Sequence, residues 1–186
     1  MTAAEYFEQM YASSSDPWHL AERPYEQRKY EVTVASLPRG RYRRAFEPGC
    51  SIGLLTALLA PRCDELIATD TVAAPLATAR AAVPSEHVTF AEATVPDAWP
   101  AGELDLVVLS EILYFLSAED RAGVLARVLE SLSPDGHLVL VHWRHPFAEA
   151  ACTGDHAHAE VAAASGLVTL VQHLEDDFRL EVLGRG

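Results

Sequence analysis

Short apolar runs alternate with helix-like stretches between residues 38 and 143, and this alternation limits the fold more than any other feature of the sequence. The runs at 104–109 and 137–143 have the nearly continuous apolar character of strands buried on both faces. Strands that alternate with helices predict a parallel sheet with helices on both faces. The other predicted strands are residues 44–47, 65–70 and 88–90, and the predicted helices are residues 52–60, 73–82 and 118–132.

The end of the chain follows a different pattern. Residues 166–174 and 178–183 are strand-like, and only three residues separate them. A gap this short cannot hold a crossover helix, so the two strands are predicted to pair antiparallel as a hairpin. The sequence Pro-Asp-Gly at 134–136 predicts a turn between the last helix and the fifth strand. The expected fold is therefore α/β, with five strands and their helices followed by a terminal hairpin.

Composition limits the class of protein and its partners. The 186 residues are 49% apolar and 22% charged, which fits one globular domain. A net charge of −13 disfavours binding to nucleic acid or to an anionic membrane. No apolar run approaches the ~18 residues that span a bilayer, and the N-terminus lacks the basic start of a signal peptide. An odd number of cysteines, without C-x-x-C spacing, suits a reducing cytoplasm. We expect one cytoplasmic domain, with residues 1–37 as a helical lid segment and residues 38–186 as the core.

The sharpest motif is Glu-Pro-Gly-Cys-Ser-Ile-Gly at 47–53, between the first predicted strand and the following helix. Small residues there let a ligand approach the backbone, and the start of the helix offers N–H groups. Asp70 ends the second predicted strand, where a carboxylate can accept hydrogen bonds from both hydroxyls of a ribose. Each feature alone fits a tight turn or a helix cap equally well. Together they favour a nucleoside-type ligand, and the absence of G-x-G-x-x-G weakens a nicotinamide cofactor.

The chain resembles the class I S-adenosylmethionine-dependent methyltransferases, and within them the NodS-like (nodulation protein S) branch. The stretches that carry the resemblance are residues 16–18, 25–30, 49–53, 110–116 and 142–146. The resemblance implies a Rossmann-like, mostly parallel seven-stranded sheet with an antiparallel C-terminal hairpin. It also implies S-adenosylmethionine as cofactor and S-adenosylhomocysteine as product. Nodulation protein S methylates the nitrogen of a glucosamine unit, so the implied activity is N-methylation of an amino sugar or another small biosynthetic amine.

The resemblance also implies which residues meet the cofactor. Glu47 meets the methionine amino group, and Asp70 meets the ribose hydroxyls. The adenine is expected after the third strand, where Thr94 stands in place of the family's common aspartate. The full set of predicted cofactor-binding residues is Trp18, Glu47, Gly49, Cys50, Ser51, Gly53, Asp70, Thr94, Val95 and Ser110.

The acceptor is expected beyond the carboxyl ends of the fourth and fifth strands, beside the segment 154–158, which the sequence predicts to be a loop. Methyl transfer needs a collinear arrangement of nucleophile, methyl group and sulfur, and an amine nucleophile must be unprotonated. The predicted catalytic residues are Glu111, His142 and His145. The predicted substrate-binding residues are Tyr114, Trp143, Asp155 and His158.

Several alternatives stay open. His142 also suits a buried structural histidine, and Trp143 suits simple packing. The histidines, Cys152 and Asp155 could hold zinc or iron, but their spacing matches no standard site, so no metal is predicted. The alternative functions are O- or C-methylation of another metabolite and non-catalytic binding of the cofactor. A small-molecule acceptor is the expected partner, and the sequence does not predict an oligomeric state.

Overall fold

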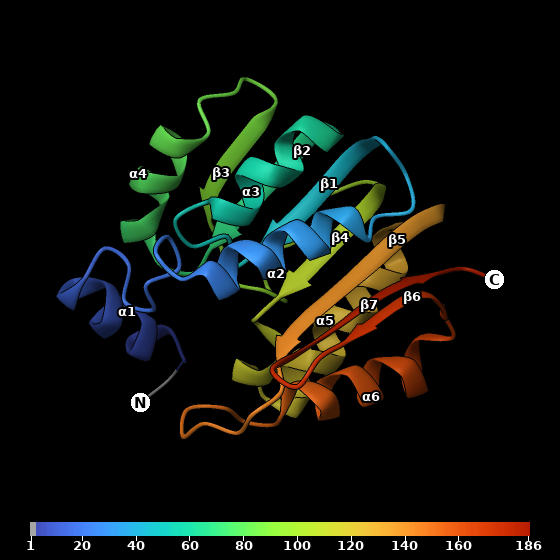
Figure 1. Cartoon of the computed structure of the whole chain (residues 1–186). Coiled ribbons are helices and arrows are strands. Elements are labelled where there is room, and N and C mark those ends of the chain that lie inside the picture. The colour runs from blue at the N-terminus through green and yellow to red at the C-terminus, as the bar shows by residue number, and fades with distance from the viewer. Residues whose placement is uncertain (1–2) are drawn as a thin grey trace. The chain divides into compact units, whose positions relative to one another are not determined.

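The computed structural model describes residues 3–186, in which helices and strands alternate as predicted (Figure 1). The elements up to residue 94 are α1 (Ala3–Ser13), α2 (Pro24–Ala35), β1 (Tyr42–Pro48), α3 (Leu54–Leu59), the 3-10 turn η1 (Ala60–Arg62), β2 (Cys63–Asp70), α4 (Ala73–Ala82) and β3 (Val88–Glu92). The later elements are β4 (Leu104–Ser110), the 3-10 turn η2 (Leu113–Phe115), α5 (Ala118–Ser131), β5 (Leu132–Trp143), α6 (Gly154–Ser165), β6 (Val168–Leu174) and β7 (Phe178–Gly184).

The strands have the order β3-β2-β1-β4-β5-β7-β6 in a seven-stranded sheet. Strand β2 pairs in parallel with both β1 and β3, and β4 pairs in parallel with β5. Strand β7 runs antiparallel to both β5 and β6, because the short gap at 175–177 turns the chain straight back. The predicted fold class, a mostly parallel Rossmann-like sheet with an antiparallel C-terminal hairpin, is confirmed.

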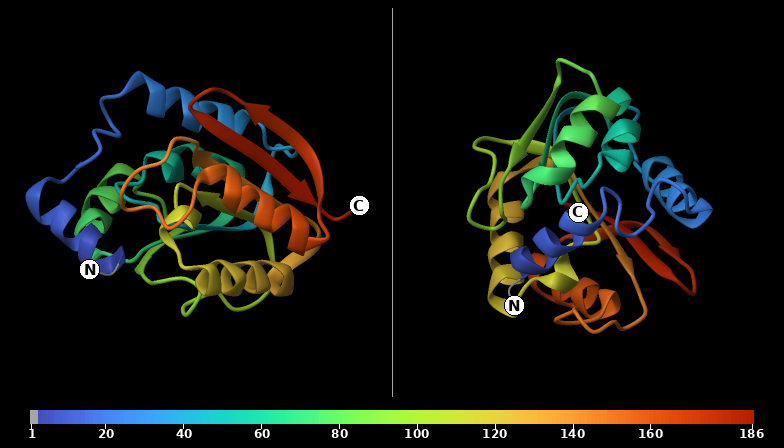
Figure 2. Two further views of the ribbon diagram at one scale, coloured as in Figure 1. Left: turned by 90° about the horizontal axis from the view of Figure 1, so that it is seen from below. Right: turned by 90° about the vertical axis from the view of Figure 1, so that its left-hand side faces the viewer.

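The described chain divides into two compact units, residues 1–94 and 95–186. In the first unit, helix α4 contacts β3 and helix α1 contacts α4 (Figures 1 and 2). Helix α2 contacts α3, so both N-terminal helices pack within this unit. Phe46 and Leu66 are fully buried on neighbouring strands. The register brings the last residues of β1 and β2 together, with Pro48 opposite Thr69.

In the second unit, helix α6 contacts β5 and β7 (Figures 1 and 2). Strands β4 and β5 are buried almost along their whole length, as their apolar sequences predict. Strand β6 is more exposed, with Leu170 and Leu174 among its exposed side chains. Within residues 3–186, no helix combines the length and apolar character that crossing a bilayer requires.

The segment 154–158 is not a loop, so that prediction is wrong. These residues form the first turn of α6, which is capped by the side chain of Thr153, whose Oγ1 accepts the His156 N–H at 3.2 Å. Gly154 is the reason that the helix can start here, because a side chain at this position would overlap the carbonyl oxygen of Trp143. Asp155 and His158 therefore occupy fixed positions on a helix.

The turn at 134–136 is also placed differently from the prediction. Strand β5 begins at Leu132, directly after α5 ends at Ser131. The pairing with β4 jumps from Leu132 to His137, so residues 133–136 leave the ladder as an irregularity inside the strand. The turn signal marks a break in pairing rather than the start of the strand.

Candidate functional site

The loop after β1 is held in a left-handed backbone conformation. Gly49, Ser51 and Gly53 have φ angles of 77°, 50° and 82°. Glycine adopts such angles without steric cost, whereas Ser51 is strained there. At Gly53 an added Cβ would lie 2.9 Å from the Cβ of Ala79 on α4, so the loop also needs glycine for close packing. The sequence motif therefore folds as the tight, side-chain-poor turn that it predicts.

Backbone hydrogen bonds fasten this loop to the end of β2. The N–H groups of Gly49 and Cys50 both donate to the carbonyl oxygen of Thr69, at 2.7 and 2.9 Å. The Gly53 N–H donates to the carbonyl oxygen of Cys50 at 2.9 Å. These N–H groups already donate within the protein. They therefore fasten the loop to β2, and the expectation that the start of α3 offers N–H groups to a ligand stays a prediction.

Asp70 connects the loop to the next helix. Its Oδ2 accepts the N–H of Ser51 at 2.9 Å, and its Oδ1 accepts the N–H of Val72, the N-cap of α4, at 3.0 Å. Burial raises the pKa of the Asp70 carboxyl, and hydrogen bonds from backbone N–H groups oppose that rise. A carboxylate has about four acceptor sites, so these contacts leave capacity for a ligand hydroxyl.

Glu47 lies on β1 directly before the loop and is 2% exposed. The hydroxyl of Thr56 on α3 donates to its Oε2 at 2.7 Å. Burial, together with the nearby charge of Asp70, raises the pKa of Glu47 to about 8, although the hydrogen bond from Thr56 lowers it. At neutral pH this side chain is therefore mostly protonated, and a cation placed beside it would favour its ionisation.

Aromatic side chains of the N-terminal segment lie against the loop. The Tyr11 and Ser51 hydroxyl oxygens are 2.6 Å apart and share a hydrogen bond. The Trp18 ring packs edge-on against Tyr11, with ring centroids 5.4 Å apart. Burial raises the pKa of the Tyr11 hydroxyl, so the residue stays a neutral hydrogen-bonding group. Tyr11 belongs to the predicted lid segment, but the sequence does not indicate its contact with Ser51.

The remaining predicted cofactor residues are Cys50 in the loop, Thr94 and Val95 after β3, and Ser110 at the end of β4. The Cys50 thiol is buried against Ala68 and Leu76, which raises its pKa and makes it a packing group. The Thr94 hydroxyl shares a 2.6 Å hydrogen bond with Thr71, which follows Asp70. In the second unit, Val95 is buried, and Ser110 ends β4 opposite Val141.

In the second unit, Glu111 follows β4 in a left-handed conformation with φ 59°. Its Oε2 accepts the backbone N–H of Trp143 at 2.9 Å and also accepts the hydroxyl of Tyr114. Its own N–H donates to the carbonyl oxygen of Val141 at 2.8 Å. Strained non-glycine residues occur preferentially at functional sites. The structure thus brings together three residues that the sequence predicts for the acceptor side.

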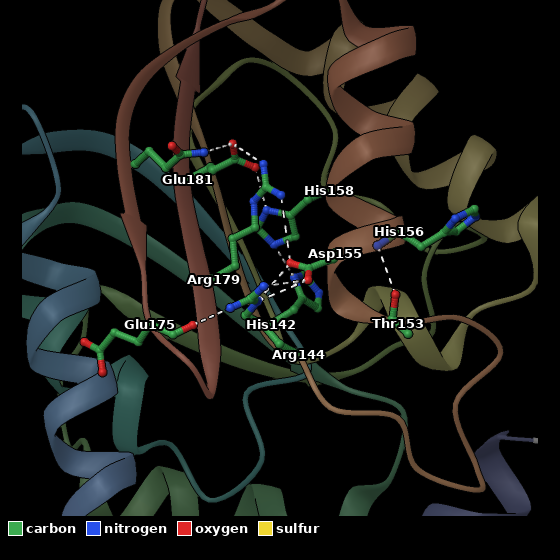
Figure 3. A network of polar contacts seen from close by, with 10 residues as sticks. His142, Arg144, Thr153, Asp155, His156, His158, Glu175, Arg179 and Glu181 are labelled. Atoms are coloured by element: carbon green, nitrogen blue, oxygen red, sulfur yellow. Dashed lines mark hydrogen bonds and ion pairs between the residues drawn. The ribbon is translucent and has the colours of Figure 1, made fainter.

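His142 and His158 are both fully buried and hydrogen-bonded to each other (Figure 3). His142 Nδ1 lies 3.0 Å from His158 Nε2, and His158 Nδ1 lies 2.7 Å from Oε2 of Glu181. His142 Nε2 accepts the N–H of Leu113 at 3.2 Å. This arrangement fits the structural alternative for His142. Glu181, on β7, is not among the predicted site residues, because no sequence motif marks it.

Asp155 and His145 belong to more exposed ion pairs, of which Figure 3 shows the pair of Asp155 with Arg144. Arg144 binds the Asp155 carboxylate, with Nε 3.2 and 3.1 Å from its two oxygens. His145 Nε2 lies 2.9 Å from Oδ1 of Asp177. The carboxylate of Asp155 is thus neutralised by a cation of this chain. In residues 3–186, no three His, Cys, Asp or Glu side chains are grouped so that they could hold one metal ion.

The strand order, the glycine loop after β1 and the acid at the end of β2 define the Rossmann-like methyltransferase class of fold. A family model of Nodulation protein S (NodS) matches residues 5–174, and the chain belongs to this family. The resemblance seen in the sequence is therefore confirmed.

Individual relatives agree with this family. Nodulation protein S of Rhizobium tropici is 34% identical over 131 residues, which cover 68% of this chain and 55% of that relative. The match thus spans little more than half the length of this relative. A crystal structure of a Pseudomonas syringae protein classed as a methyltransferase is 40% identical, has a TM-score of 0.77, and covers 88% of this chain and 100% of its own. The N-methyltransferase NodS of Bradyrhizobium japonicum WM9, in complex with S-adenosyl-L-homocysteine, shares the fold with a TM-score of 0.81 at 23% identity, over 98% of both chains.

Proposed function

We propose that this chain is an S-adenosylmethionine-dependent methyltransferase that methylates the nitrogen of a small amine, such as an amino sugar or another biosynthetic amine. The observation that carries the proposal is the fastening of the Gly49–Gly53 loop to Asp70, at the adjoining ends of β1 and β2. Nodulation protein S is the family to which the chain belongs, and its Bradyrhizobium member is an N-methyltransferase with bound S-adenosylhomocysteine. The same chemistry in this chain is consistent with both facts.

The residues around the loop fit such a cofactor. Asp70 keeps acceptor capacity for ribose hydroxyls while its backbone contacts hold it in place. Glu47 is a buried acid that a ligand ammonium group would ionise. The glycines leave the loop surface open to close approach. When bound, the cofactor supplies an electrophilic methyl group on a sulfonium, and these side chains hold and orient it.

On the acceptor side, Glu111 is the best placed residue to handle a proton. Its carboxylate is fixed by the N–H of Trp143 and by the hydroxyl of Tyr114. A fixed acceptor can orient an amine through its N–H and take up a proton, which leaves the nitrogen lone pair available for attack. His142 contributes differently, because both of its ring nitrogens are engaged inside the protein.

The first test is calorimetric titration with S-adenosylmethionine and S-adenosylhomocysteine, with NAD as the control ligand. Saturable binding of the first two, and none of NAD, is the expected result. Failure of both to bind, with or without a glucosamine oligomer, would contradict the proposal.

The second test is methyl transfer to glucosamine oligomers, followed by mass spectrometry that locates the added methyl group. Methylation on nitrogen is expected, whereas methyl on oxygen or carbon would favour the alternative transferase. Cofactor binding without transfer to any acceptor would favour a non-catalytic binding module. Glu111→Gln should lower turnover and leave cofactor affinity nearly unchanged. Glu119→Gln, at the exposed start of α5, is the matched control and should behave like the wild type.

A further inference from the structure

A series of three hydrogen-bonded, buried side chains joins the middle of β7 to turn η2. It runs from Glu181 on β7 through His158 on α6 to His142 on β5, with contacts of 2.7 and 3.0 Å (Figure 3). The exposed fractions of the two histidines are 0%, and that of Glu181 is 4%. The last hydrogen bond of the series joins His142 to the backbone N–H of Leu113, the first residue of η2. Buried polar networks of this kind favour one arrangement, since every unpaired group would be costly.

The hydrogen bonds allow one consistent placement of protons. The Leu113 N–H donates to Nε2 of His142, so that nitrogen carries a lone pair and the ring proton lies on Nδ1. This Nδ1–H then donates to Nε2 of His158, whose own proton must lie on Nδ1. The Nδ1–H of His158 donates in turn to the carboxylate of Glu181. Glu181 does not contact His142, but it sets the tautomer of His142 through His158, which lies between them.

Glu181 is suited to this role because it stays ionised. Burial raises its pKa, but hydrogen bonds from His158 and Arg179 outweigh that effect and lower the pKa to about 2. Its second oxygen, Oε1, accepts from Nη2 of Arg179 at 2.9 Å and from Nε2 of Gln172 at 3.1 Å. Three donors thus converge on one carboxylate, which acts only as an acceptor.

At the other end of this hydrogen-bonded series, His142 supports the predicted acceptor site. His142 holds the start of η2 through Leu113, and its ring packs edge-on against the ring of Tyr114, 5.3 Å between centroids. The hydroxyl of Tyr114 in turn donates to Glu111. The position of Tyr114 against Glu111 therefore depends on a contact that His142 can make in one tautomer only.

We infer that His158 and Glu181 are positioning residues of the methyltransferase site: they fix His142 in the tautomer that holds η2 and so keep Tyr114 against Glu111. This inference rests on the proposed function. Neither residue needs to touch the acceptor or the cofactor.

The decisive variant is Glu181→Gln. Arg179 and Gln172 both donate toward Oε1, so they select the amide oxygen at that place and leave the amide NH₂ facing His158. His158 must then accept on Nδ1 and carry its proton on Nε2. That proton forces the proton of His142 onto Nε2, where it opposes the Leu113 N–H. One substitution should therefore reverse both tautomers and release η2.

The experiment combines nitrogen-15 NMR of the histidine rings with methyl-transfer kinetics on a glucosamine oligomer. In the wild type both rings should carry the proton on Nδ1, and in Glu181→Gln both should carry it on Nε2. The variant's kcat should fall by about 10- to 100-fold. Its cofactor affinity, measured by calorimetry, should change less than about twofold. The control is Gln172→Ala, which removes one donor to Oε1 and leaves the chain of contacts intact, so it should behave like the wild type.

The outcomes separate this inference from the proposed function. A wild-type His142 with its proton on Nε2 would overturn the inference even if the variant failed to fold. Normal transfer by the wild type and equally fast transfer by Glu181→Gln would also overturn it, while the proposed function would stand. No transfer by the wild type to any amine would overturn the proposed function, and the positioning role with it.

Discussion

The carboxylate of Asp70 accepts the backbone N–H of Ser51, with 2.9 Å between the nitrogen and Oδ2. This bond joins the end of β2 to the loop after β1 and holds Ser51 in a left-handed conformation that a non-glycine residue seldom adopts. One side chain therefore shapes the loop and, under the proposed function, also meets the ribose.

Replacement of Asp70 tests both roles. Asp70→Ala leaves the N–H groups of Ser51 and Val72 without their acceptor, so we expect a loss of about 1–3 kcal/mol in cofactor binding free energy. Calorimetric titration with S-adenosylhomocysteine measures it. Asp64→Ala, at the exposed beginning of the same strand, loses only a surface ion pair with Arg41 and should bind like the wild type. Equal affinities for the two variants would refute the role of Asp70.

Cofactor binding should release a proton from Glu47. The pKa of this carboxyl is raised to about 8, so the group is mostly protonated at pH 7 and must ionise to meet a ligand ammonium group. Affinity should therefore rise as the pH increases from 6 toward 7.5. Calorimetry at pH 7 in buffers of different ionisation enthalpy counts the protons: about one released by the wild type and about none by Glu47→Gln. The same count in both proteins would contradict this coupling.

Glu47 should also make the free protein less stable in alkali. Its pKa is about 8 in the folded state against 4.5 in its ordinary state, so the folded protein binds the proton more tightly. The stabilising effect of that proton is fully present below pH 4.5 and is lost as the pH rises through 8. Glu47→Gln keeps an acceptor for Thr56 and has no charge to bury.

We expect the free energy of unfolding of Glu47→Gln, relative to wild type, to improve by about 2–4 kcal/mol between pH 5 and pH 8. Urea unfolding at the two pH values measures this difference. Glu65→Gln, an exposed position on β2, should show no such trend and serves as the control. A constant difference for Glu47→Gln at both pH values would disprove the effect.

The sequence predicts the fold well where the signal is local. The apolar runs identify β4 and β5, and the short gap at 175–177 fixes the antiparallel hairpin. The start of α6 is locally encoded too, since Thr153 is a good N-cap and Asp155 suits a first turn, although residues 154–158 are predicted to be a loop. In that case the glycine serves packing against β5, which only the tertiary structure reveals.

The partners of polar side chains were harder to predict. The sequence indicates that Asp70 and Glu111 stand at strand ends, but it does not indicate which N–H groups they accept. His142, His158 and Glu181 lie on β5, α6 and β7, and they meet only because β7 pairs beside β5. Their roles depend on packing between distant segments, so no spacing rule could assign the buried pair of histidines.

Gly53→Ala should damage the loop more than an ordinary glycine replacement. Gly53 and Gly166 both have positive φ angles, of 82° and 66°, but only at Gly53 would the new Cβ meet another atom, 2.9 Å from Ala79. Gly166→Ala therefore reports the cost of the backbone angle alone, about 1 kcal/mol. Gly53→Ala should lose about 1–3 kcal/mol more in unfolding free energy because α4 must shift. Thermal and urea unfolding compare the two variants, and equal losses would argue against the close contact.

Tyr11 and Ser51 provide a test of the N-terminal segment as a lid. Their hydroxyls share a 2.6 Å hydrogen bond, and Tyr11 is largely buried. Tyr11→Phe and Ser51→Ala each remove one partner, and the double variant removes both, which completes a double-mutant cycle. Because the contact is between the segment and the loop, we expect a coupling free energy of about 0.5–1.5 kcal/mol in cofactor binding.

The cycle should be measured by calorimetry with S-adenosylhomocysteine and repeated for unfolding in urea. Coupling in binding that exceeds the coupling in unfolding would mean that the ligand strengthens the contact, as a lid requires. Equal coupling in both measurements would mean that the hydrogen bond only stabilises the fold, and the N-terminal segment would then be a fixed part of the first unit. Limited proteolysis gives an independent measure: a lid predicts that ligand slows cleavage before residue 37, and that Tyr11→Phe weakens this protection.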